Sequence, residues 1–123
     1  MESILFTPVK IGPLTLRNRT IRSAAFESMC PGNAPSKQLL DYHHSVAKGG
    51  VGMTTVAYAA VCQSGLSFER QLWMRPEIVP GLRELTDEIT MASMYLNGIK
   101  SRLTSQAHGV SVCLCHSREF VGT

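Results

Sequence analysis

The chain has 123 residues, of which 44% are hydrophobic and 17% are charged, as is usual for a single soluble globular domain. The net charge is only +3, and no run of Lys or Arg occurs, so a nucleic-acid-binding protein is not expected. No stretch reaches the ~18 apolar residues of a membrane span, and the first residues lack the apolar core of a signal peptide.

The four cysteines are irregularly spaced, and only Cys113 and Cys115 lie close together. A single Cys-x-Cys pair without a second pair of ligands makes a poor zinc site, so no metal is expected. Without a secretory context, we expect free thiols in a reducing compartment, and therefore a cytoplasmic protein.

The first predicted element is a hairpin. Residues 4–17 alternate apolar and polar positions, and Gly12-Pro13 marks a turn. The pattern predicts two short strands, Phe6 to Ile11 and Leu14 to Leu16, which form a lid.

Residues 20–26 predict a short strand that ends in small side chains, Ser23, Ala24 and Ala25. Small residues at the carboxyl end of a strand allow a flat ligand to approach the backbone closely. The alternative is that they fit a crowded core, and composition alone does not separate the two.

Ser36 is a good N-cap for a helix that extends to about Lys48 and ends at Gly49-Gly50. His43 belongs to its apolar stripe. Adjacent helical residues point about 100° apart, so His43 and His44 are not expected to share a metal: one lies in the stripe and the other on the surface.

Residues 51–61 are continuously apolar, which is typical of a strand buried on both faces of a parallel sheet. Strand, helix and strand together predict a βαβ unit. A second helix is expected from Pro76 or Pro80 to Asn97-Gly98, and residues 110–115 predict a third short strand. Residues 99–109 are ambiguous.

The sequence also resembles a known family. Residues 5–24 resemble the start of the old yellow enzyme family, the NADH:flavin oxidoreductases, and residues 47–61 and 75–87 resemble its second strand and second helix. The resemblance covers residues 4 to about 87. The residues that match the family's opening are Phe6, Pro8, Ile11, Gly12, Leu16, Asn18 and Arg19.

The resemblance implies an α/β fold, the N-terminal part of a (β/α)8 TIM barrel with about three strands and a β-hairpin lid. FMN would bind at the C-terminal face of such a barrel. By resemblance, the cofactor contacts fall on Ser23, Ala24, Ala25 and Phe26 at the end of the first strand and on Ala60 at the end of the second. Many members carry Pro-Met followed by Thr or Cys where this chain has Ala24, Ala25 and Phe26.

In the family, hydride passes from NAD(P)H through FMN to an activated alkene, a small-molecule substrate. The His/His or His/Asn pair and the Tyr that assist this reaction lie on later strands. They have no counterpart here, so no catalytic residue is predicted, and the chain is expected to be a truncated form that is inactive alone.

The last third of the chain departs from the family. Residues 88–105 are interpreted as an atypical insertion, after which 106–123 form either a third strand or an out-of-frame tail. In the first case, Cys113 takes the position of a flavin-binding Gln, and Leu114 and His116 also match.

Two other functions compete with the flavoenzyme interpretation. One is a non-catalytic interaction protein that pairs through an open barrel edge, for instance as a homo-oligomer. The other is a nucleic-acid or metal-binding module, which the scattered charge and the lone Cys-x-Cys pair disfavour.

Overall fold

The N-terminal segment forms a helical turn and a hairpin in the computed structural model, which describes residues 3–12, 14–97, 101–104 and 113–116. Strand β1 (Val9–Ile11) pairs antiparallel with β2 (Leu14–Leu16), as predicted. The expectation that the first strand begins at Phe6 is wrong. Ile4–Phe6 is a 3-10 turn, because the carbonyl of Ile4 accepts from both the Thr7 N–H and the Thr7 hydroxyl.

The predicted βαβ unit is present, with shorter strands than expected. Strand β3 (Ile21–Arg22) pairs in parallel with β4 (Met53–Thr55), and α1 (Lys37–Lys48) connects them. The parallel ladder therefore ends at the pair of Arg22 and Thr54. The residues that follow each strand leave the sheet.

The sheet is completed by two antiparallel strands. Strand β6 (Cys113–His116) pairs antiparallel with β4, and β5 (Ser101–Thr104) pairs antiparallel with β6. A strand forms where residues 110–115 predicted one, but the expectation that it extends a parallel barrel is wrong, because it runs against β4. Strands β1 and β2 form a separate two-stranded sheet, and the other described strands form an open mixed sheet of order β3-β4-β6-β5 rather than a closed barrel.

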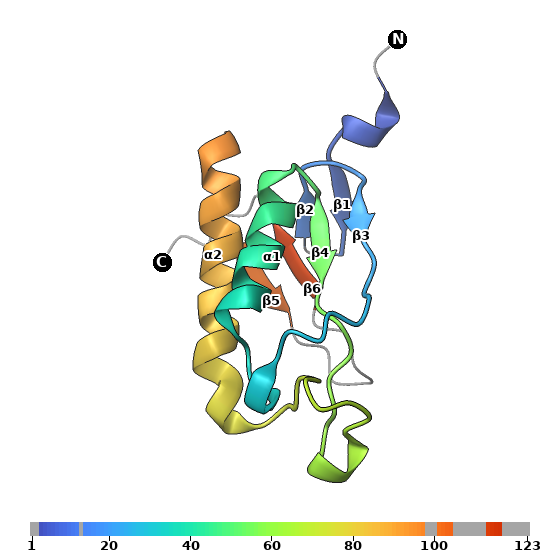
Figure 1. The fold of residues 1–123 in the computed structure, drawn as a ribbon. Helices are drawn as coiled ribbons and strands as arrows, with labels where there is room; N and C mark the ends of the chain where they lie inside the picture. Colours follow the sequence, from blue (N-terminus) through green and yellow to red (C-terminus); the bar gives the residue numbers. More distant parts are fainter. Residues whose placement is uncertain (1–2, 13, 98–100, 105–112, 117–123) are drawn as a thin grey trace.

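Helices α1 and α2 (Val79–Asn97) lie side by side along one face of the sheet (Figure 1). The predicted stripe of α1 is buried except for Val46, which is half-buried, and the apolar residues of α2 face it. Within the described part of the chain, no helix is long and apolar enough to cross a membrane. The buried residues that the two helices contribute are Leu39, Leu40, His43, Ala47, Leu82, Leu85 and Ile89.

The end of the hairpin is tied to the loop that enters β4. The Arg17 guanidinium donates to the carbonyls of Ala47, at 2.7 Å, and Val51, at 2.8 Å, and the Asn18 amide donates to the Gly50 carbonyl at 2.7 Å. Partial burial lowers the pKa of Arg17. These bonds hold the hairpin at the amino end of β4, opposite the end where the predicted site residues lie.

Candidate functional site

The predicted flavin contacts of the first and second strands meet at one edge of the sheet. Because β3 and β4 are parallel, the segments that follow them both leave from the carboxyl edge, where ligands bind in α/β sheets. Ser23–Phe26 and Ala57–Ala60 are called here the strand-end surface. All four residues of the first segment, Ser23–Phe26, are exposed. In the second segment, Ala57–Ala60, the three alanines are buried.

The first segment has the backbone that a flat polar-edged ligand requires. In the described structure, the backbone N–H and C=O groups of Ala24, Ala25 and Phe26 form no hydrogen bond with other residues. Free backbone groups next to small side chains can bond the rim of a flavin and allow its ring to approach. These backbone groups and small side chains are the features of the chain that would suit FMN.

Ala60 lies at the end of the second segment, but its backbone is already engaged. Its N–H donates to the Leu72 carbonyl and its C=O accepts from the Met74 N–H, both at 2.8 Å. A flavin contact by Ala60 would therefore use its methyl group or the second lone pair of its carbonyl. The contact stays a prediction.

Cys113 lies at the same edge of the sheet, although β6 runs in the unexpected direction. Cys113 is the first residue of β6 and is opposite Thr55, the last residue of β4. An antiparallel strand places its first residue where a parallel strand would place its last. The backbone of Cys113 is thus close to the end of β4, and its role in flavin binding stays a prediction.

Phe26 belongs to a group of three aromatic rings. Its ring centroid lies 4.6 Å from that of Phe68 and 5.6 Å from that of Tyr58. Phe26 and Phe68 remain 38% and 49% exposed. At this position the chain therefore presents an apolar surface, whereas many members of the old yellow enzyme family have a polar side chain there.

The structure also contains a buried polar network that the sequence interpretation missed. The Glu27 carboxylate accepts from Arg22, at 3.1 Å, from His43, at 2.9 Å, and from the backbone N–H of Ala57, at 3.2 Å. The side chains of His43 and Glu27 are 0% and 5% exposed. A polar His in an apolar stripe requires a buried partner, and this was the available signal.

The remainder of the network fixes Arg22 and His43. Arg22 also donates to the Thr55 carbonyl at 2.8 Å, and its guanidinium lies 4.8 Å from the centroid of the Tyr42 ring. The other ring nitrogen of His43 bonds the Thr54 hydroxyl at 2.9 Å. His44, by contrast, is half-exposed and pairs with Glu88, so the predicted division between stripe and surface is confirmed.

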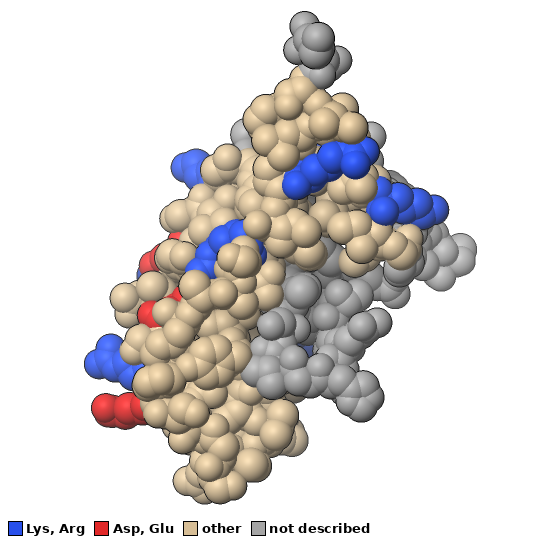
Figure 2. Space-filling model, turned by 90° about the vertical axis from the view of Figure 1, so that its right-hand side faces the viewer, with Lys and Arg blue, Asp and Glu red and all other residues tan. Residues whose placement is uncertain are grey.

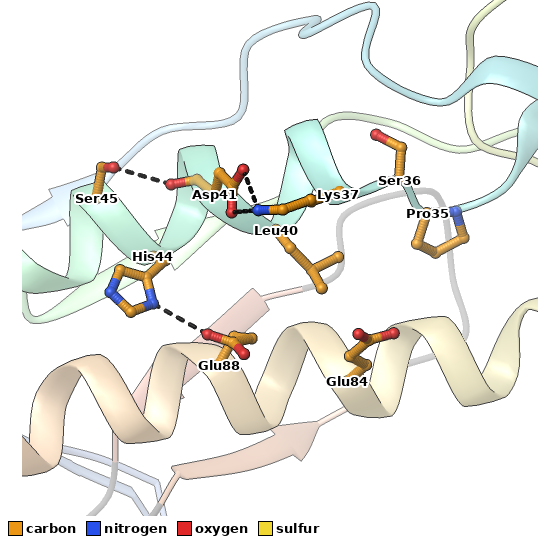
Figure 3. Close-up of a pocket in the computed structure, with 9 residues that line it drawn as sticks. All are labelled: Pro35, Ser36, Lys37, Leu40, Asp41, His44, Ser45, Glu84 and Glu88. Carbon is orange, nitrogen blue, oxygen red and sulfur yellow. Dashed lines mark hydrogen bonds and ion pairs between the residues drawn. The ribbon is translucent and has the colours of Figure 1, made fainter.

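A groove lies between α1 and α2, and none of the residues that line it belongs to the strand-end surface (Figure 3). The groove is lined by polar and titratable groups: Lys37 pairs with Asp41 at 2.7 Å, His44 pairs with Glu88 at 3.1 Å, and Glu84 also lines it. A small-molecule site usually has mostly apolar walls. This groove is therefore a poor candidate for a flavin.

The hollow at the strand ends is small, with a volume of about 10 Å³ between Phe26, Glu27, Tyr58 and Leu72. This is about the volume that holds one water. A flavin would therefore lie across the exposed strand-end surface and not inside this hollow.

Two further features bear on ligands. Among the described residues, no group of three or more His, Cys, Asp or Glu side chains is placed to hold a metal ion. Figure 2 shows Lys and Arg side chains spread over one face, with uncharged surface between most of them.

Comparisons with known proteins agree on one family. The NADH:flavin oxidoreductase / NADH oxidase family matches residues 4–97. The 4,4'-dithiodibutanoate disulfide reductase of Rhodococcus erythropolis is 47% identical over 85 residues, which are 69% of this chain and 21% of that protein. A metal reductase of Desulforamulus reducens is 32% identical over 112 residues, which are 85% of this chain and 17% of that protein.

A solved structure gives the same result. The structure of 2-naphthoyl-CoA reductase in complex with 2-naphthoyl-CoA superposes on this chain with a TM-score of 0.69 and 25% sequence identity. The match covers 73% of this chain and 14% of the reductase chain. The chain spans about a fifth or less of the length of these relatives. The family match runs past residue 87, and the insertion at 88–105 stays a prediction.

Proposed function

Because the chain belongs to the NADH:flavin oxidoreductase / NADH oxidase family, we propose that it forms part of the FMN site of an oxidoreductase. The observation that carries this proposal is the strand-end surface. There, exposed residues whose backbone groups bond no other described residue lie beside buried alanines. Bound FMN would supply hydride transfer from NAD(P)H to a small-molecule acceptor such as an activated alkene.

The residues of this chain would bind and orient the ring. The backbone of Ala24–Phe26 offers donors and acceptors to its polar edge, and the small side chains of Ser23, Ala24 and Ala25 leave room for its face. Phe26, Tyr58 and Phe68 would cover an apolar part of the ring or of the acceptor. Within residues 1–123 we assign no acid, base or nucleophile.

The relatives favour a reductase but do not define the acceptor. They are described as a disulfide reductase, a metal reductase and a 2-naphthoyl-CoA reductase, three different chemistries. We therefore propose a flavin site and specify the electron acceptor only as a small molecule. The free thiols of Cys30 and Cys62 fit a reducing, cytoplasmic location.

The proposal is tested by titrating FMN into the 123-residue chain and following flavin fluorescence. We compare the wild type with Ala25→Leu, which places a large side chain on the strand-end surface. Gln38→Leu, an exposed position on α1, is the control. We expect binding to the wild type and Gln38→Leu, and a Kd raised about tenfold, or ~1.4 kcal/mol, by Ala25→Leu. Equal affinity of all three chains would contradict the site.

A second candidate function is pairing through an open sheet edge. Strand β3 has a partner on one side only within the described structure, and its Ile21 is 50% exposed. Edge strands with free backbone groups pair readily with other chains. Light scattering that shows a mass rising with concentration would support this function, and a constant monomer mass would exclude it.

A further inference from the structure

Ser23–Phe26 must be held in place without using its own backbone hydrogen bonds. The parallel ladder ends at the pair of Arg22 and Thr54, and from Ala24 to Phe26 no backbone bond connects the segment to β4. An unpaired segment of this kind is free to move unless its ends are fixed. One end is fixed by the ladder itself.

The other end is fixed by a side chain. Glu27 directly follows the segment, and its carboxylate accepts from the backbone N–H of Ala57 in the second segment at 3.2 Å. The same carboxylate bonds Arg22, which precedes the first segment, at 3.1 Å. Glu27 therefore links both flanks of Ser23–Phe26 to the second half of the strand-end surface.

The link is rigid because Glu27 and His43 are buried and Arg22 is partly buried, and all three are joined by hydrogen bonds. His43 holds Oε1 of Glu27 at 2.9 Å and is itself held by Thr54, so the carboxylate cannot rotate away without breaking several bonds. Hydrogen bonds to a charged group in a buried site are about twice as strong as neutral ones. Loss of one member leaves the others buried without a partner.

From this geometry we infer that Glu27 is a positioning residue for FMN. Its carboxylate sets the distance between Ser23–Phe26 and Ala57–Ala60 and leaves the backbone of the first segment free for the ligand. Arg22 and His43 act through Glu27 and do not touch the cofactor. The inference rests on the proposed FMN site.

The first test compares Glu27→Gln with Asp41→Asn, which removes the same charge from an exposed ion pair on α1. FMN affinity is measured by fluorescence titration and the exchange rate of the Ala57 amide by NMR. We expect Glu27→Gln to raise the Kd about tenfold and to accelerate exchange at Ala57, and Asp41→Asn to change neither. An unchanged Kd in Glu27→Gln would overturn the inference.

A second comparison separates positioning from stability. Leu85 is 0% exposed and belongs to α2, outside Ser23–Phe26 and Ala57–Ala60, so Leu85→Ala destabilises the fold without changing a residue of the strand-end surface. Affinity corrected for the folded fraction is expected to stay at the wild-type value in Leu85→Ala. An equal loss of corrected affinity in Leu85→Ala and Glu27→Gln would show that Glu27 acts through stability alone, against the inference.

If Glu27→Gln does not fold, Glu27→Asp is used to test whether Glu27 positions the FMN-binding segments. It keeps the charge for Arg22 and His43 but shortens the reach to Ala57, and we expect a raised Kd. Wild-type affinity in Glu27→Asp would overturn the inference. A wild-type chain that shows no FMN binding while the Ala57 amide is protected would refute the proposed function instead.

Discussion

Gly52 lies where the chain enters β4, against the residues that lead into β3. A Cβ at this position would lie 2.6 Å from the Asn18 carbonyl oxygen and 3.0 Å from that of Thr20. Backbone atoms cannot yield as a flexible side chain can, so any larger residue must push the two strands apart.

We therefore expect Gly52→Ala to destabilise the protein by about 1–3 kcal/mol. Gly65→Ala is the matched control, because its nearest neighbour, the Cys62 sulfur, lies at an ordinary 3.5 Å. Thermal unfolding of both variants measures the difference. Equal midpoints would show that the approach at Gly52 is not a constraint.

The two cysteines with described side chains differ in reactivity. Burial, with a contribution from Glu27, raises the pKa of Cys30 to about 11. A hydrogen bond from the Ser64 hydroxyl lowers the pKa of the exposed Cys62. Since the thiolate is the nucleophile, Cys62 should react first.

We expect a thiol reagent to alkylate Cys62 well before Cys30 near neutral pH, as peptide mapping can show. Ser64→Ala removes a donor to the thiolate, so the pKa of Cys62 rises and its rate profile moves to higher pH. Cys30 should become reactive only above its raised pKa or on unfolding. Faster labelling of Cys30 in the native protein would refute this assignment.

At the scale of elements, α1 begins at a side-chain cap. The Ser36 hydroxyl accepts from the Leu39 N–H at 3.2 Å and donates to the Met29 carbonyl. It therefore joins the helix start to the loop that follows the strand-end surface. Its loss leaves an unpaired N–H in the first turn.

Ser36→Ala is expected to lower the free energy of unfolding by about 1–2 kcal/mol. Ser45→Ala, which removes an exposed hydroxyl bonded to the Asp41 carbonyl, should stay within ~0.5 kcal/mol of the wild type. Urea unfolding followed by circular dichroism measures both. A loss in Ser45→Ala equal to that in Ser36→Ala would contradict the role of the cap.

Helices were more predictable than strands for a physical reason. The cap at Ser36 and the stripe of α1 are local features of the sequence, and the structure confirms both. The limits of β3 depend instead on where its distant partner β4 stops pairing. The expected strand over 20–26 was too long because Ala24–Phe26 leave the ladder, and composition does not encode that departure.

The direction of β6 and the Glu27 network escaped prediction for the same reason. Apolar alternation indicates that a strand forms but not which neighbour it pairs with or in which direction. Glu27, Arg22 and His43 are separated in sequence and meet only after α1 packs on the sheet. The assignment of Ser23–Phe26 to a flavin site came from the family resemblance, and it stays a prediction.

At the scale of the whole molecule, the two helices cover one face of the sheet and the strand-end surface forms one of its edges (Figure 1). We propose that this surface contacts the flavin ring, and among the described residues we assign none to the phosphate of FMN. We therefore expect weak binding, with a Kd of about 1 mM or a free energy of about −4 kcal/mol.

The most direct test is an NMR titration of the isotopically labelled chain with FMN. We predict that the amide chemical shifts change at Ser23–Phe26 and Ala57–Ala60. They should stay constant along the groove between α1 and α2, at Lys37, Asp41 and His44. Shifts confined to that groove, or none at millimolar FMN, would contradict this prediction.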